Sequence, residues 1–165
     1  MNFDKQEWQS MWDAINRSQA VIEFSPDGTI LSANENFLGA VGYTLAEVQG
    51  KHHRLFCDGS YANSAEYKDF WASLGRGEYH SKEFQRYGKG GAEIWIQASY
   101  NPIFGRDGSV VKVVKFATDI TQRKIQNADF EGKVNAISRS QAMIEFNLDG
   151  TIITANDNFL SAVGY

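Results

Sequence analysis

The side-chain types with the greatest chemical reactivity lie in one short tract of the sequence. His52 and His53 precede Cys57, which is the only cysteine of the chain. A histidine near a thiol is the arrangement of a nucleophile and its base, and would indicate an enzyme. However, the chain has no G-x-S-x-G motif, no phosphate-binding loop and no carboxylates at metal-ligand spacing. A single cysteine is usually a packed structural residue, so we expect no enzymatic activity.

The histidines are also candidate ligands for an iron ion. The chain has three of them, His52, His53 and His80, and haem iron takes a histidine as an axial ligand. For each histidine the alternative is a structural role, either exposed to solvent or hydrogen-bonded. With only Cys57 available, an internal disulfide and a multi-cysteine zinc site are excluded.

Composition limits the class of protein in which these residues act. The 165 residues are 42% hydrophobic and 13% aromatic, as expected of a globular core. The net charge of -4 and a pI near 5.4 argue against a nucleic-acid-binding surface. We find no secretory signal and no apolar run long enough to span a membrane, and we therefore expect a cytoplasmic protein without direct membrane insertion. A parent protein tethered to a membrane remains an alternative.

The elements that must position these residues follow a simple order. Two strand-like runs are joined by Ser25-Pro26-Asp27-Gly28, a turn sequence that predicts a hairpin. Short helical segments come next, and three strand-like runs with glycine-rich connections complete the domain. The strands are expected at 20–24, 29–33, 79–87, 93–104 and 109–119, and the helices at 34–41, 45–48 and 62–74. This order predicts an α+β domain, with one five-stranded antiparallel sheet and its helices on one face.

Helices are also predicted on either side of this domain. Residues 1–17 include Trp8, Met11, Trp12 and Ile15 at helical spacing, an amphipathic pattern. This helix either covers its own domain or packs against a second subunit through Trp8 and Trp12, which would make a homodimer. A polar, helix-permissive linker follows at 122–137.

An internal repeat marks the domain boundary. The segment from Asp13 to Tyr43 returns 122 residues later, from Asn135 to Tyr165, with 22 identities in 31 aligned positions. A period this long indicates a duplicated domain rather than a solenoid. We therefore predict one domain at 18–121 and the truncated start of a second at 138–165. The second copy would lack most of its strands, and we expect it to expose apolar surface or to pack on a neighbour.

The predicted order of elements and several motifs resemble the PAS family of sensory domains. The resemblance covers 18–121, and its motifs are Ile30-Leu31-Ser32-Ala33-Asn34, Gly42-Tyr43-Thr44, Gly50-Lys51, Lys89-Gly90-Gly91, Trp95-Ile96, Asn101-Pro102-Ile103 and Asp119-Ile120-Thr121. The tracts 50–56 and 95–102 look like those of the tandem PAS region of methyl-accepting chemotaxis transducers, of the soluble or aerotaxis-like kind. This resemblance implies a PAS fold, a pocket between sheet and helices, and a role in signal transduction.

The family resemblance leaves open which cofactor, if any, this pocket holds. In the light-sensing LOV group a reactive cysteine stands where this chain has His53, and the residues that hold the flavin ring fall on Arg86, Ile96 and Ala117, so a photoreceptor of that type is not expected. In oxygen-sensing haem PAS proteins the iron ligand aligns near Ala65, where this chain has no histidine, so haem would need His53 in another geometry.

Similarity to aerotaxis receptors favours FAD, with His53 and Arg54 near its phosphates or ring oxygens and Trp95 beside the ring. Asn34 and Arg86 complete the candidate binding set. Helix capping is the alternative role for Asn34, a surface salt bridge for Arg54 and a sheet anchor for Trp95. FAD, haem and an empty pocket in a module that only dimerises all remain open.

The resemblance also implies an output. In this family the Asp-Ile-Thr turn, here with Asp119 and Thr121, ties the core to an output helix. The partners so implied are a downstream methyl-accepting signalling domain and the chemotaxis kinase complex.

Overall fold

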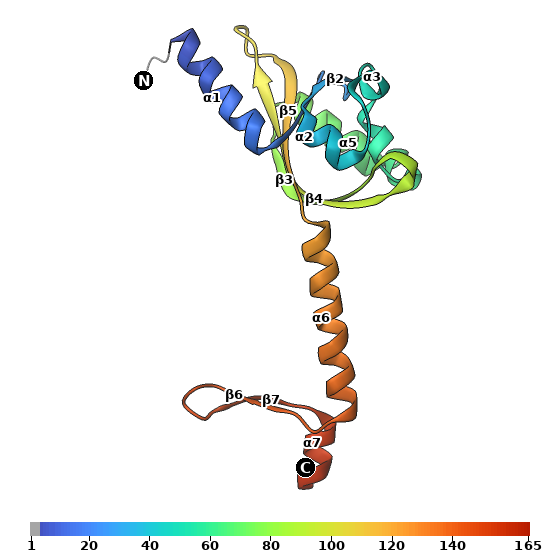
Figure 1. Cartoon of the computed structure of the whole chain (residues 1–165), viewed down its shortest axis with the longest axis vertical. Coiled ribbons are helices and arrows are strands. Elements are labelled where there is room, and N and C mark those ends of the chain that lie inside the picture. The colour runs from blue at the N-terminus through green and yellow to red at the C-terminus, as the bar shows by residue number, and fades with distance from the viewer. Residues whose placement is uncertain (1–3) are drawn as a thin grey trace. The chain divides into compact units, whose positions relative to one another are not determined.

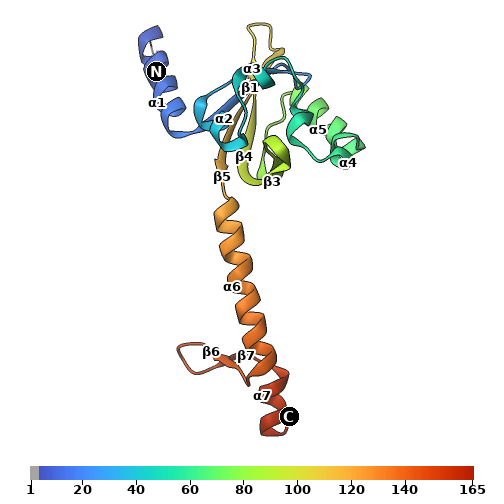
Figure 2. The ribbon, with the colours of Figure 1, turned by 45° about the vertical axis from the view of Figure 1, so that its right-hand side comes forward.

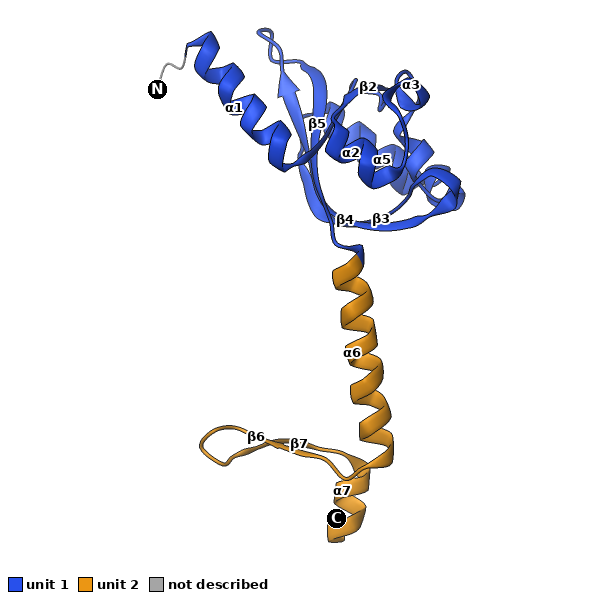
Figure 3. Cartoon of the chain, in the orientation of Figure 1, with its two compact units in different colours: residues 1–121 blue, residues 122–165 orange. Residues whose placement is uncertain are grey.

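The computed structural model describes residues 4–165, which divide into two compact units (Figure 3). The first unit ends at Thr121, and the second comprises Gln122–Tyr165. The boundary lies where the last strand of the sheet gives way to a long helix (Figure 1).

The first unit contains a five-stranded antiparallel sheet in the spatial order β2-β1-β5-β4-β3 (Figure 1). Its strands are β1 Ala20–Phe24, β2 Ile30–Ala33, β3 His80–Tyr87, β4 Glu93–Phe104 and β5 Val110–Asp119. Its helices are α1 Lys5–Ser18, α2 Glu35–Val41, α3 Leu45–Val48, η1 His53–Phe56, α4 Gly59–Ala62, α5 Ala65–Gly75 and η2 Lys89–Gly91. The predicted α+β class with one antiparallel five-stranded sheet is confirmed.

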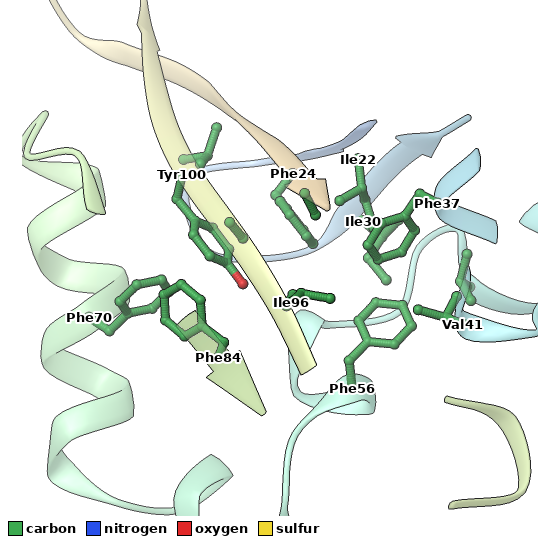
Figure 4. Close-up of a cluster of buried hydrophobic side chains, with 14 of the residues drawn as sticks. Ile22, Phe24, Ile30, Phe37, Val41, Phe56, Phe70, Phe84, Ile96 and Tyr100 are labelled. Atoms are coloured by element: carbon green, nitrogen blue, oxygen red, sulfur yellow. The ribbon is translucent and has the colours of Figure 1, made fainter. Parts of the chain in front are cut away.

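The sequence of β4 shows how the sheet separates its two faces. Side chains alternate along a strand, and the buried positions of β4 are Ile94, Ile96, Ala98 and Tyr100. These four side chains join the core between the sheet and the helices α2, η1 and α5 (Figure 4). Trp95 has the opposite parity and lies on the other face of the sheet.

Helix α1 contacts this other face. The Trp12 ring meets the Phe116 ring of β5 edge-on, with 6.4 Å between the ring centroids. Trp8 is nevertheless 58% exposed and Met11 44% exposed. The helix, drawn at one side of the first unit in Figure 2, therefore contacts its own sheet through Trp12 and leaves Trp8 and Met11 exposed to solvent.

The helix expected at 62–74 begins later than predicted. Residues 59–62 form the separate short helix α4, and α5 starts at Ala65. The Ser64 hydroxyl accepts a hydrogen bond from the Tyr67 backbone N–H at 3.1 Å, so Ser64 is the N-cap of α5. Serine is a preferred residue at this position because its side chain satisfies a free N–H of the first turn.

The second unit repeats the local structure of the first. It consists of α6 Thr121–Ser140, which starts on the last residue of the first unit, followed by β6 Ile144–Phe146, β7 Ile152–Ala155 and α7 Asp157–Val163. Ile144 pairs with Ala155 as Ile22 pairs with Ala33, and both hairpins carry a bulge at the following phenylalanine. Several apolar side chains of this unit are exposed, namely Phe146, Leu148, Ile152, Ile153 and Val163.

Candidate ligand cavity and signalling turn

A buried histidine lies at the centre of the core. The His53 side chain is inaccessible to solvent. Its Nδ1 lies 2.9 Å from the Tyr67 hydroxyl and its Nε2 lies 2.9 Å from the Tyr100 hydroxyl. Burial lowers the pKa of His53 well below its usual value, and the nearby positive charges of Arg86 and Lys115 lower it further. The imidazole is therefore neutral, with one ring nitrogen as donor and the other as acceptor.

The turn of the first hairpin holds His53 in this place. The His53 backbone N–H donates to the Gly28 carbonyl at 2.9 Å. Gly28 has a φ of 91°, and a Cβ atom there would approach Trp71 Cε2 to 2.8 Å. Only glycine combines this backbone conformation with so close an approach. The Asp27-Gly28 turn thus positions the first residue of η1 against the sheet.

Two cationic side chains are buried beside this histidine. Arg86 on β3 is 4% exposed and Lys115 on β5 is 1% exposed. The Arg86 guanidinium donates from Nη1 to the Gln85 carbonyl at 2.7 Å, and its Nη2 lies 3.5 Å from the Tyr100 hydroxyl. The Lys115 Nζ lies 5.0 Å from the centroid of the Tyr100 ring. Among residues 4–165, Arg86 Nε and Lys115 Nζ find no hydrogen-bond partner.

Both cations line one small cavity under the sheet. Its volume is about 20 Å³, and its polar lining consists of Arg86, Lys115 and Asp119. Ala20 and Ala117 face each other across β1 and β5 and also line it. These short side chains leave the space next to Lys115. The rest of the lining is apolar, from α2, η1 and β4, namely Phe37, Ala40, Val41, Phe56, Ile94 and Ile96.

No carboxylate in the described part of the chain neutralises either cation. Within residues 4–165, the ion pairs join other residues and none includes Arg86 or Lys115. Asp119 is exposed, and its Oδ1 accepts a hydrogen bond from the Thr121 backbone N–H at 2.8 Å. Burial lowers the pKa of Lys115 well below its usual value, and the Arg86 charge lowers it further.

The turn that follows β5 is tied to β4. The Ile120 backbone N–H donates to the Trp95 carbonyl at 2.8 Å, and the Trp95 backbone N–H donates to Thr121 Oγ1 at 2.9 Å. Together with the bond from the Thr121 N–H to Asp119, these contacts fix the residue at which α6 begins. Asp119 therefore belongs both to the cavity and to the start of α6.

The geometry agrees with comparisons to known proteins. A family model described as the PAS fold matches residues 16–125. The chain belongs to the PAS family. It is 49% identical over 152 residues to the biofilm dispersion protein BdlA of Pseudomonas aeruginosa, covering 92% of this chain and 36% of BdlA.

Two further likenesses are weaker. The aerotaxis receptor of Escherichia coli is 30% identical over 96 residues, which cover 58% of this chain and 19% of the receptor. A light-oxygen-voltage domain structure, whose subject is a flavin analogue, superposes with a TM-score of 0.58 at 22% identity, covering 77% of this chain and 96% of that domain. The chain thus spans about a third of BdlA and a fifth of the aerotaxis receptor. The predicted PAS identity and the similarity to an aerotaxis receptor are confirmed, whereas the tandem arrangement of PAS domains stays a prediction.

The PAS domain brings together only part of the predicted cofactor-binding set. His53 and Arg86 meet at the Tyr100 hydroxyl. Arg54 is exposed and does not line the cavity. The Trp95 side chain lies on the opposite face of the sheet, with its Nε1 donating to Glu93 at 3.0 Å, so the expectation that it packs beside a ligand in this cavity is wrong.

Asn34 also needs correction as a cavity residue of the PAS domain. Its Oδ1 accepts from the Val21 and Phe37 backbone N–H groups at 2.9 and 3.0 Å, and its Nδ2 donates to the Gln19 carbonyl at 2.8 Å. The amide is the N-cap of α2 and joins α1, β1 and α2. Its hydrogen-bonding groups are used within the fold.

The remaining reactive side chains have structural partners. His52 Nε2 lies 2.7 Å from the Asp27 carbonyl, and His80 Nε2 lies 2.6 Å from the Ser73 hydroxyl. Burial raises the pKa of the Cys57 thiol, which makes it a weaker nucleophile. Both ring nitrogens of His53 are hydrogen-bonded, so an iron ion would have to displace a tyrosine. No cluster of His, Cys, Asp and Glu within residues 4–165 has the arrangement of a metal site, and no helix in that range is both long and apolar enough to cross a bilayer.

The sequence analysis did not name Lys115, although the spacing of the lysines along β5 indicates that one of them faces the core. Lys112 and Lys115 are separated by three positions in a β-branched run. Side chains on a strand alternate between faces, so the two lysines must lie on opposite faces of the sheet. The structure places Lys112 on the outer face, paired with Glu23 at 2.9 Å, and Lys115 in the core. No comparable pattern in the sequence predicts that the Tyr67 and Tyr100 hydroxyls bind His53.

Proposed function

We propose that this PAS domain is the sensory input module of a cytoplasmic chemotaxis-type signalling protein. In it, a ligand in the core cavity sets the conformation of the turn after β5. The kinship with BdlA and with the aerotaxis receptor supports the sensory role. The observation that carries the proposal is that Asp119 lines the cavity and also binds the first backbone N–H of α6.

The β5 strand provides a short route from the cavity to α6. Lys115, Ala117 and Asp119 lie on one face of β5, and all three line the cavity. A ligand that draws Lys115 toward itself shifts this strand, and with it the carboxylate that holds Thr121. A switch needs an element with two states whose balance the ligand changes. The start of α6, fixed by the bonds of Asp119 and Trp95, is that element.

The residues around the cavity do not fit a flavin. A cavity of about 20 Å³ is far smaller than a tricyclic ring. The core around it is filled by buried side chains, among them Phe24 and Tyr100 (Figure 4) and also His53. Ile96 and Ala117, which face the cavity, have no side-chain hydrogen-bonding group. We therefore propose a small, colourless ligand in place of FAD. An absorption spectrum of the purified protein with flavin bands that bleach with dithionite would contradict this.

Asp119→Ala in the parent signalling protein tests the transmission route. We expect loss of the ligand-dependent change in kinase output, while ligand binding is retained. Asp107→Ala is a matched control, because the Asp107 Oδ1 also accepts from a backbone N–H two residues later, Ser109, at 3.1 Å, but in the exposed β4–β5 loop. Normal signalling by Asp119→Ala, or loss of ligand binding in it, would refute the proposed division of roles.

A second proposed function is dimerisation through α1. The exposed apolar surface of Trp8 and Met11 favours it. We expect the protein to be a homodimer by light scattering, and Trp8→Ser to shift it toward the monomer. A monomeric wild type at high concentration would contradict this. The downstream partners that we propose are a methyl-accepting signalling domain and its kinase complex.

A further inference from the structure

Arg86 and Lys115 place two unused donors, Nε and Nζ, beside one cavity in the core. We propose that this cavity binds a small carboxylate anion, held between the Arg86 guanidinium and the Lys115 ammonium. The inference rests on the proposed sensory function and names the ligand class of the same site.

The charge of Arg86 requires a partner that the described residues do not supply. An arginine keeps its proton in proteins, and a buried charge without a counter-charge is strongly unfavourable. Tyr100 contacts the guanidinium, but burial raises the pKa of its phenol to about 12, so it is uncharged at neutral pH. The Cys57 thiol is likewise protonated, because burial raises its pKa. An anion from solution would supply the missing charge.

The shape of the cavity selects among anions. Its volume of about 20 Å³ admits only a small ion. Arginine presents paired donors that match the two oxygens of a carboxylate. The Asp119 carboxylate at the same cavity disfavours a dianion such as hydrogen phosphate. Formate, the smallest monocarboxylate, matches these conditions.

Lys115 is the second residue that contacts the carboxylate in this proposal. Its Nζ lies 5.0 and 5.2 Å from the centroids of the Tyr100 and Phe37 rings. A cation near an aromatic face is still able to donate hydrogen bonds. Its position on β5, two residues from Ala117 and four from Asp119, also connects the ligand to the turn.

Isothermal titration calorimetry of the whole 165-residue chain tests the inference. Sodium formate is titrated in a carboxylate-free buffer, with sodium chloride and sodium phosphate at matched ionic strength as comparison anions. We expect saturable binding of a carboxylate, and a dissociation constant at least tenfold higher in Lys115→Met. Lys112→Met is the matched control on the outer face of the same strand and should bind as the wild type does. Circular dichroism checks that each variant is folded.

A second readout locates the ligand independently of folding. The Nε–H resonance of Arg86 in an NMR spectrum, assigned with Arg86→Lys, should shift on addition of carboxylate and stay in place with chloride. Equal binding by Lys115→Met, chloride or phosphate binding as tight as carboxylate, or no binding at all would overturn the inference. If the wild type binds no carboxylate and Asp119→Ala loses its output, the ligand class is refuted and the sensory role stands. If the wild type binds the carboxylate and Asp119→Ala keeps its output, the sensory role is refuted and the ligand class stands.

Discussion

Replacing Lys115 by methionine should stabilise the unliganded protein. Methionine keeps the unbranched stem of the side chain in the core. It removes the amine of a residue that is 1% exposed, an amine to which no described residue offers a hydrogen bond. Burying an unsatisfied polar group costs about 1–3 kcal/mol. The lost attraction to the Tyr100 and Phe37 rings, about 0.5–1 kcal/mol, offsets part of the gain. We expect a net increase of about 0–2.5 kcal/mol in the free energy of unfolding, and a rise in Tm of about 4 °C per kcal/mol for a domain of this size.

The pH dependence provides an independent check of the same reasoning. The pKa of Lys115 in the folded protein is lowered from its ordinary value of 10.5. Between the two values the unfolded chain binds more protons than the folded protein, so the stability of the wild type rises with pH in this range. The penalty of charging the buried amine is complete below the folded pKa and disappears above 10.5. The advantage of Lys115→Met should therefore shrink as the pH is raised toward 10.

Urea unfolding at several pH values, in carboxylate-free buffer, measures both effects. Lys112→Met is the control, because it removes a lysine from the outer face of the same strand, where the Lys112 and Glu23 side chains of the ion pair are 35% and 20% exposed. An exposed ion pair contributes only about 0–1 kcal/mol, so this variant should be neutral or slightly destabilised. A destabilised Lys115→Met with a neutral Lys112→Met would refute the assignment of Lys115 as an unsatisfied amine.

Two further substitutions test the polar cluster and the helix cap. Tyr100→Phe leaves His53 Nε2 and one donor of Arg86 without a partner, and should lower the free energy of unfolding by about 1–3 kcal/mol; an unchanged urea midpoint would show that the hydroxyl is not needed. Asn34→Ala removes the N-cap of α2 and its bond to β1, and should cost about 1–2 kcal/mol in thermal unfolding. A loss below 0.5 kcal/mol, a value on the order of a neutral surface change, would contradict the capping role.

Local sequence patterns account for most of the fold. The Asp27-Gly28 turn and the alternation along residues 93–104 predict the hairpins and the strands within one residue of their observed bounds. Such patterns depend on neighbours along the chain, and neighbours are visible in a sequence. The break at Ser64 was missed because the apolar spacing of Tyr67, Phe70 and Trp71 continues to fit one helix, whichever residue caps its start.

The site was predicted less completely. His53 and Arg86 were named through family resemblance, and the structure joins them through Tyr100. Trp95 was assigned to a ligand although its parity along the strand opposes that of Ile94 and Ile96. Its backbone, rather than its ring, contributes to the site by holding the start of α6.

By itself, the sequence determined the family, the duplicated segment, the sheet and the turn at Asp119. Hydrophobic period, turn residues and repeated motifs are local properties, which need no knowledge of the fold. Only the tertiary structure decided that Arg86 on β3 and Lys115 on β5 share a cavity, and that no carboxylate of residues 4–165 neutralises them. Burial and the lack of a counter-charge depend on which distant segments surround a group, and that arrangement exists only once the sheet and its helices have packed together.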